Sequence, residues 1–265
     1  MNKKLCIGII FTTALVTIIT AFSFAPIAQD QTYHAFADSR AFFDISNFGD
    51  VVSNLPFTIF GLMGLAFLFN KESDKSHLSM HGEQFLWKVF FFGITLVGLG
   101  SGYYHLNPEN STLVWDRLPM TIVFMSFLPL VIMERIDVNA GLVLFPLLLA
   151  VGIGSVFYWD YTESLGEGDL RLYALVQFLS LLLILLIFWL FPAKFTGMKY
   201  IGFTLGWYAL AKLLEHFDKA IFDFLWNMAS GHTLKHIAAS IGAYTMLLYV
   251  KKKRILVASL IHDQV

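Results

Sequence analysis

The stretch "GSGYYHLNPENSTLVWDRLPM", from Gly100 to Met120, joins two long apolar runs and decides the fold. It carries Ser101, His105 and Asp116 close to the boundary between those runs. Hydroxyl and ionisable groups at the edge of a lipid-facing segment are costly to desolvate unless they have partners. We therefore expect these three side chains to meet other polar groups or a metal ion.

The composition is that of an integral membrane protein. Of the 265 residues 57% are hydrophobic and only 14% are charged, whereas soluble proteins carry about 25% charged residues. The net charge of −1 provides no basic surface and excludes nucleic acid as a partner. Because Cys6 is the only cysteine, disulfides and thiolate metal sites are excluded, and any metal must be bound by His, Asp or Glu.

The apolar runs predict an all-α protein. A membrane span needs about 20 mostly apolar residues. Eight segments meet this requirement, at residues 5–27, 51–69, 86–106, 117–133, 140–158, 170–191, 200–215 and 233–250. The connections between them are short, so no separate soluble domain is expected.

The first segment has two interpretations. Lys3 and Lys4 precede an apolar stretch, as in a signal peptide, and small residues near Ala25 resemble a cleavage site. The stretch is long enough to span, however, and Pro26 follows at once, which favours an uncleaved helix. Either interpretation places residue 30 on the far side of the membrane.

Basic residues give the expected orientation, since cytoplasmic loops are enriched in Lys and Arg. With the N-terminus in the cytoplasm, twelve of the 18 basic residues fall in inner segments. The other six lie near outer ends, at Arg40, Arg117, Arg171, Lys212, Lys219 and Lys235. The sequence therefore predicts a multi-pass protein of the cell membrane with both termini in the cytoplasm.

This topology brings distant residues to one side of the membrane. His105 and Ser101 fall at the outer end of the third span, and Asp116 begins the fourth. The eighth span opens with "GHTLKHIAAS", which places His232 and His236 in its first outer turns. Three histidines, an aspartate and a serine should thus converge at the extracytoplasmic side.

The spacing of these residues suits a zinc hydrolase. His232 and His236 are four residues apart, so they share a helix face and can bind one ion. His105 is the best third ligand, and Ser101 lies one turn before it on the same face. Three imidazoles leave an open zinc position for water. Asp116 would then transfer protons, and Ser101 would donate a hydrogen bond to the developing oxyanion.

Other polar residues have simpler interpretations. His77 and His81 repeat the four-residue spacing in a polar loop, where we expect them to be solvated. Lys235 projects off the face of the paired histidines and is expected to reach the membrane interface. The sequence leaves three roles open: His216 as a rival ligand or a partner of one, and Glu215 and Asp218 as interfacial acids or partners of an imidazole.

Together these residues resemble the alkaline ceramidase family and, more broadly, the CREST superfamily of seven-span membrane proteins. The resemblance rests on Ser101 and His105, on Asp116 within "WDRLPM", and on His232 and His236. "DVVSNLPF", at residues 50–57, also looks like the first helix of the family. The resemblance covers residues 38–250 or so, and the combination of motifs is specific although each motif alone is weak.

The resemblance implies a fold and domain limits. A seven-helix ceramidase-like membrane domain would occupy residues 51–250. One additional N-terminal transmembrane helix or signal segment (1–28), an extracytoplasmic segment (29–50) and a cytoplasmic tail (251–265) would complete the chain.

The resemblance also implies an activity. His105, His232 and His236 would bind zinc, with Asp116 and Ser101 as catalytic residues. The reaction would hydrolyse the amide of ceramide, a sphingolipid, to a long-chain base and a fatty acid. The "ADSR" and "NFGDVVSNLPF" segments look closer to bacterial members of the family, so a related lipid substrate stays open.

Calcium is a weaker implication of the same resemblance, because eukaryotic members carry an acidic N-terminal calcium-binding segment. Asp38, Asp44 and Asn47 supply oxygen ligands of the right kind.

Two other functions compete with lipid amide hydrolysis. One is a receptor-like seven-transmembrane protein in which zinc holds helices together, as suggested by the adiponectin-receptor relatives in the superfamily. The other is a transporter with a proton relay, which is disfavoured because the ionisable residues gather at one end of the spans instead of the midplane.

Overall fold

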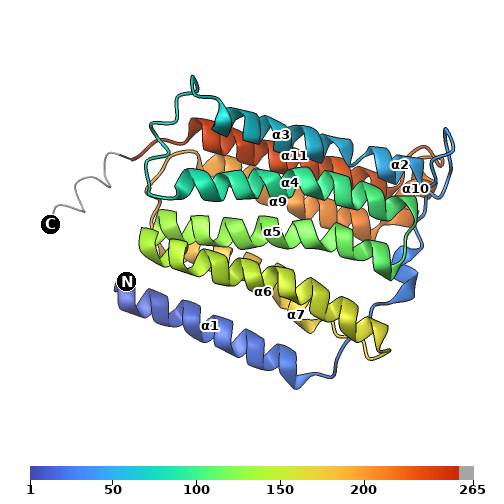
Figure 1. Cartoon of the computed structure of the whole chain (residues 1–265), viewed down its shortest axis with the longest axis horizontal. Coiled ribbons are helices and arrows are strands. Elements are labelled where there is room, and N and C mark those ends of the chain that lie inside the picture. The colour runs from blue at the N-terminus through green and yellow to red at the C-terminus, as the bar shows by residue number, and fades with distance from the viewer. Residues whose placement is uncertain (257–265) are drawn as a thin grey trace.

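Helices make up nearly all the regular structure of residues 1–256, the part of the chain that the computed structural model describes. Within that part, the only extended pairings are two isolated bridges. The long helices run side by side along one axis (Figure 1). In order they are α1 (Lys3–Ser23), the 3₁₀ turn η1 (Gln31–His34), α2 (Phe48–Val52), α3 (Leu55–Phe69), α4 (Glu83–Leu106), α5 (Asn110–Arg135), α6 (Val138–Ser164), α7 (Arg171–Ala174), the π-helical stretch η2 (Leu175–Leu179), α8 (Ser180–Leu190), α9 (Met198–His216), α10 (Asp218–Phe224) and α11 (Gly231–Lys252).

The all-α membrane architecture predicted from the sequence is confirmed in its coarse form. In the described part of the chain, six helices or helix sets are long and apolar enough to cross a membrane. They are α1, α2 with α3, α4, α5, α6, and the set α7, η2 and α8. The last two expected spans are also helices, α9 and α11, but they are not among the six. The expected count of eight spans stays a prediction, and residues 257–265 of the expected tail lie outside the described part.

Two ends of the bundle can be told apart. The short helices α2 and α10 lie at one end, which we call the α10 end, and the N-terminus lies at the other (Figure 1). At the N-terminal end, the ammonium of Lys3 donates a hydrogen bond to the carbonyl of Ile136, just after α5, at 3.2 Å.

The first helix ends earlier than expected. The sequence predicted helix to residue 27, but α1 ends at Ser23 and Phe24 has extended backbone angles. The reason lies in Pro26, because the ring of a proline disfavours helical geometry at the residue before it. The chain therefore leaves α1 in an extended segment that returns across the α10 end of the bundle.

The fourth expected span begins earlier than its apolar pattern indicated. α5 begins at Asn110, where Glu109 and Thr112 bond reciprocally to each other's backbone in a capping box. Glutamate is not among the usual first residues of that motif, so the sequence gave a weak signal. Asp116 therefore lies in the second turn of a helix, and not at its start.

The second expected span is broken near its beginning. α2 ends at Val52, and α3 starts at Leu55 with Pro56 in its first turn. The side chains of Ser53 and Asn54, at the break, are both buried. Both donate hydrogen bonds to the backbone oxygen of Asp50, at 3.1 and 2.7 Å. The break therefore places buried polar groups inside the bundle, and the side-chain oxygen of Asn54 has no hydrogen bond in the described structure.

A buried ionic cluster ties three helices together at the N-terminal end. Lys253, fully buried after α11, forms ion pairs with Glu83 at the start of α4 and with Glu134 near the end of α5. The Lys253–Glu134 distance is 2.5 Å, and the hydroxyl of Tyr249 donates to Glu134 at 2.7 Å. Because removal of one member leaves the others charged and unpaired, such clusters are sensitive to mutation.

Lys253→Met should therefore destabilise the fold strongly. We expect a loss of about 3–5 kcal/mol, because both carboxylates stay buried without their cation. Thermal unfolding in detergent measures the effect, and Lys252→Met, which changes an exposed neighbour, is the matched control. Equal melting temperatures for the two variants would contradict a stabilising role for the cluster.

The polar loop between α3 and α4 corrects one expectation. His77 was expected to be solvated, but it is only 5% exposed, and its Nε2 lies 2.7 Å from the carbonyl oxygen of Val250. Burial lowers the pKa of His77, which keeps the imidazole neutral. His81 is exposed as expected. This pair forms no metal cluster within residues 1–256.

Candidate metal centre

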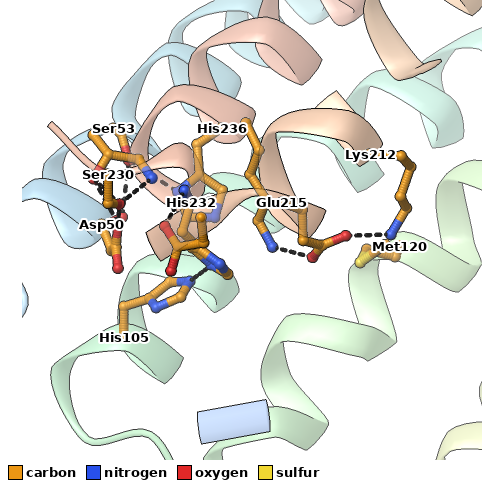
Figure 2. A network of polar contacts seen from close by, with 12 residues as sticks. Asp50, Ser53, His105, Met120, Lys212, Glu215, Ser230, His232 and His236 are labelled. Carbon is orange, nitrogen blue, oxygen red and sulfur yellow. Dashed lines mark hydrogen bonds and ion pairs between the residues drawn. The ribbon is translucent and has the colours of Figure 1, made fainter. Parts of the chain in front are cut away.

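Three buried imidazoles meet at the α10 end of the bundle. His105 comes from the last turn of α4, and His232 and His236 come from the first turns of α11. Each pair of ring centroids is 4.9 Å apart, and the Nε2 atoms of His105 and His232 are 3.3 Å apart (Figure 2). The three side chains offer ligand atoms that all lie within 4.8 Å of one another.

This arrangement fits a tetrahedral zinc ion. Two nitrogens that are each about 2.0–2.1 Å from a tetrahedral ion lie about 3.3–3.4 Å apart, which matches the observed separation of 3.3 Å. The three residues are between 1% and 5% exposed, and buried imidazoles favour the neutral form that binds metal. Within residues 1–256, no other group of three or more His, Cys, Asp or Glu residues has a comparable geometry.

The start of α11 is fixed by neighbouring acids and hydroxyls. Ser230 caps the helix by accepting a hydrogen bond from the backbone N–H of Thr233 at 2.9 Å. Asp218 accepts the backbone N–H of His232 at 2.7 Å, so two of the unpaired donors at the helix start are satisfied. A Cβ on Gly231 would lie 2.2 Å from a backbone oxygen of α9, so only glycine permits this close approach.

The end of α4, which carries His105, is also fixed by contacts with neighbouring segments. Asn47 donates a hydrogen bond from its side chain to the carbonyl of His105 at 2.8 Å, which satisfies an acceptor left free by the helix end. A Cβ on Gly100 would lie 2.0 Å from the carbonyl oxygen of Trp115. This close contact between α4 and α5 sets Ser101 and Asp116 beside each other.

A hydrogen-bonded chain selects the tautomer of His236. The Nδ1 atom lies 2.9 Å from the hydroxyl of Ser53, which donates in turn to the backbone oxygen of Asp50. With that donor committed, Ser53 accepts from Nδ1–H, and Nε2 then carries the lone pair toward the triad. The amide nitrogen of Asn54 lies farther from Nδ1, at 3.4 Å, so the shorter contact with Ser53 sets the tautomer. Such partners orient metal ligands and increase their affinity for the ion.

Ser53→Ala should therefore weaken metal binding without removing a ligand. The expected loss of zinc affinity is about 10–100-fold, typical for a partner of a ligating histidine. A competition titration with a zinc chelator measures it. Ser126→Ala is the control, because Ser126 is also buried but bonds only within α5. Unchanged affinity in Ser53→Ala would show that the hydroxyl does not orient His236.

The two residues predicted to be catalytic lie together. Ser101 is buried one turn before His105 on α4, and its side chain lies near that of Asp116 on α5. Asp116 is half-buried. The structure thus brings the three histidines together, as the sequence indicated, and places Ser101 near Asp116. The chemical roles of these five residues stay predictions.

Lys235 was expected to extend to the membrane interface, but its side chain is mostly buried and bound to a neighbouring helix. Its side chain is 17% exposed, and its ammonium forms an ion pair with Glu215 of α9 at 2.6 Å. Glu215 also binds Lys212 at 2.7 Å. The positive charge of Lys235, which lies beside the histidines, is therefore balanced by Glu215. Glu215 pairs with lysines and not with an imidazole.

His216 and Asp218, the other two residues whose roles the sequence left open, differ in their relation to the triad. His216 is exposed at the end of α9 and does not belong to the histidine cluster. Asp218, in contrast, supports the triad from the start of α10 through the backbone of His232.

The expected calcium ligands are engaged separately. Arg40 binds the carboxylate of Asp38 through two hydrogen bonds, both 2.7 Å, and holds the pKa of Asp38 below its usual value. Asn47 bonds to His105 through its amide, and Asp44 is exposed. These three residues therefore do not form a shared calcium cluster in the described structure.

Sequence reasoning missed several residues that support the site. Ser53 and Asn54 lie in "DVVSNLPF", where the adjacent polar pair in an apolar run was an available signal. Asp50, in the same motif, is fully buried; one oxygen accepts from the Thr233 hydroxyl at 2.6 Å, and the other has no hydrogen bond in the described structure. Phe36, which packs on two of the imidazoles, had no sequence signal.

Comparison with known proteins does not extend these observations. No family model matches the chain, and no curated protein matches it.

Proposed function

We propose that the chain is a zinc-dependent membrane hydrolase that cleaves the amide bond of ceramide or a related N-acyl lipid. The products would be a long-chain base and a fatty acid. The proposal rests chiefly on one observation: His105, from one helix, lies with its Nε2 3.3 Å from that of His232, on a helix more than 120 residues away in sequence. The resemblance to the alkaline ceramidases supports this assignment of the triad.

His105, His232 and His236 would hold the ion. Zinc bound to three imidazoles acts as a Lewis acid and lowers the pKa of water at its open position to about 7 in favourable cases. The protein supplies the rest of the chemistry through Asp116 and Ser101.

Asp116 would take one proton from the attacking water as the new C–O bond forms. It would return that proton to the amide nitrogen as the C–N bond breaks, so that the long-chain base leaves as an amine. Ser101, which lies near Asp116, would orient this carboxylate. In a second role, the hydroxyl would stabilise the oxyanion of the tetrahedral intermediate.

The setting of the site supports a lipid substrate. Six helices or helix sets are apolar enough to span a membrane, and the triad lies at one end of the bundle they form. We propose that the α10 end faces the extracytoplasmic side and that all eight long segments span the membrane. The basic residues Lys3, Arg135 and Lys253, which lie at or near the N-terminal end, support this orientation.

Metal removal and reloading test the proposal. The protein purified in detergent should contain about one zinc ion per chain. Treatment with a chelator should abolish release of fatty acid and long-chain base from N-acyl lipids, and added zinc should restore it. A zinc-loaded protein that releases neither product from a broad panel of N-acyl lipids would contradict the hydrolase assignment.

A receptor-like protein with a structural zinc site is the second candidate. The buried triad joins α4 to α11, so an ion there would tie distant parts of the bundle together. In that case the chelator should lower the melting temperature markedly, and no N-acyl lipid should be hydrolysed at any zinc concentration.

A further inference from the structure

One aromatic side chain separates the triad from the outer surface of the α10 end. The Phe36 ring lies against two imidazoles, with centroid distances of 4.6 Å to His105 and 4.3 Å to His232. It also contacts Tyr104 edge-on at 6.0 Å. Phe36 lies just after the 3₁₀ turn η1, in the segment between α1 and α2 that we call the strap (residues 24–40).

Polar anchors on both sides of Phe36 fix its position. Before it, the two ring nitrogens of His34 bond to the hydroxyl of Tyr104 at 2.8 Å and to the side-chain oxygen of Asn110 at 2.9 Å. After it, the backbone N–H of Ala37 donates to Asp218 at 3.0 Å. Asp218 is the same carboxylate that holds the start of α11, so the strap and the metal ligands share one support.

The rest of the strap is anchored to other helices. The backbone N–H of Gln29 donates to Glu163 of α6 at 2.5 Å, and its side-chain oxygen accepts from Arg117 of α5 at 2.5 Å. The carbonyl of Ile27 accepts from the backbone of Leu170 at 2.9 Å. The strap is therefore held in place by hydrogen bonds to several helices.

Phe36 also lines a polar cavity. The cavity has a volume of about 560 Å³ and is lined by the strap on one side and by the end of α9 with α10 on the other. His216, Asp218, Lys219 and Asp223 make its walls polar, and Phe222 adds an apolar side chain. Phe36 is the lining residue that also contacts the imidazoles.

We propose that Phe36 is a specificity-determining residue that closes the metal centre to water-soluble substrates entering from this cavity. An apolar ring over a metal site limits the access of water and lowers the local dielectric constant. Hydrophilic amides would be excluded from this side, and substrates would be restricted to N-acyl lipids delivered from the bilayer. The substrate restriction rests on the proposed hydrolase function, whereas the shielding of the imidazoles does not.

Phe36→Ala tests the shielding through two measurements that need no catalytic turnover. Release of zinc to a hydrophilic chelator should be about tenfold faster than in the wild type, because the apolar cover is removed. In the metal-free protein, diethyl pyrocarbonate should modify His105 and His232 faster by a similar factor, as located by mass spectrometry. Phe36→Leu, which keeps an apolar cover, should stay close to wild type in both.

Phe222→Ala is the matched control for these measurements. It enlarges the same cavity, but Phe222 has no ring contact with an imidazole in the described structure. It should leave both rates unchanged. Wild-type rates in a folded Phe36→Ala protein, or equal acceleration in Phe222→Ala, would overturn the shielding role.

Activity then tests the specificity. Phe36→Ala should raise the ratio of hydrolysis of a short, water-soluble N-acyl amide to that of a long-chain N-acyl lipid, relative to wild type. If neither variant hydrolyses any amide while the shielding measurements behave as expected, the proposed function fails and the shield stands. If hydrolysis occurs but the ratio is unchanged, the specificity role is wrong and the hydrolase stands.

Discussion

Alanine in place of His232 should remove both the bound metal and lipid amide hydrolysis. The triad has one ligand on α4 and two on α11, and its Nε2 contact is between His105 and His232. Loss of a hydrogen-bonding partner of a ligand alone lowers affinity by about 10–100-fold, so loss of a ligand should lower it by more than about 100-fold. The zinc content of the purified variant, measured by elemental analysis after dialysis, checks this expectation.

His216→Ala provides the control for metal binding. This histidine is exposed at the end of α9 and lies outside the cluster, so the variant should keep its zinc. If His216→Ala loses zinc and His232→Ala retains it, the ligand set proposed here is wrong. If His232→Ala retains hydrolysis at the wild-type rate, a zinc centre at this triad does not carry the reaction.

The convergence of the triad could be predicted from sequence because it depends on two robust signals. The four-residue spacing of His232 and His236 sets them on one helix face, and the number of intervening helices sets the end at which they meet His105. With one helix more or one fewer between them, His105 and the His232–His236 pair would lie at opposite ends of the bundle. Both signals survive errors of several residues in helix boundaries, as the early start of α5 illustrates.

The supporting groups could not be predicted in the same way. Ser53 orients His236 only because α2 and α3 break between Val52 and Leu55, and an apolar run alone predicts a continuous span. Phe36 lies in the irregular part of the strap after η1, where residue spacing does not predict the direction of a side chain. Their positions depend on tertiary contacts between the strap, α10 and α11.

Lys235 shows how a local rule fails against a tertiary contact. A lysine near a helix end usually extends its ammonium to the interface, and the sequence favoured that outcome. Glu215 reverses it by supplying a carboxylate at 2.6 Å from a neighbouring helix, which repays part of the desolvation of both groups. The same reasoning applies to Lys253, whose two carboxylate partners come from α4 and α5.

Asp116→Asn should separate catalysis from metal binding. The substitution keeps the size of the side chain and an oxygen that can accept from Ser101, but it removes the group that takes and returns the proton. We expect zinc content and melting temperature close to those of the wild type, with turnover lower by about 10²–10⁴-fold, the usual contribution of general acid–base catalysis. Release of fatty acid from an N-acyl lipid under zinc-saturating conditions measures the loss.

Ser101→Ala, alone and combined with Asp116→Asn, then distinguishes the two roles proposed for the hydroxyl. If Ser101 acts by orienting Asp116, its removal should cost little more once the carboxylate is gone, because residues that act as a unit are strongly non-additive. If it stabilises the oxyanion directly, its removal should lower turnover by about 10²–10³-fold in either background. The proximity of Ser101 to Asp116 favours the first result. Full activity in Asp116→Asn would show that proton transfer depends on another group, and the buried carboxylate of Asp50, with one oxygen lacking a partner in the described structure, would be the next candidate.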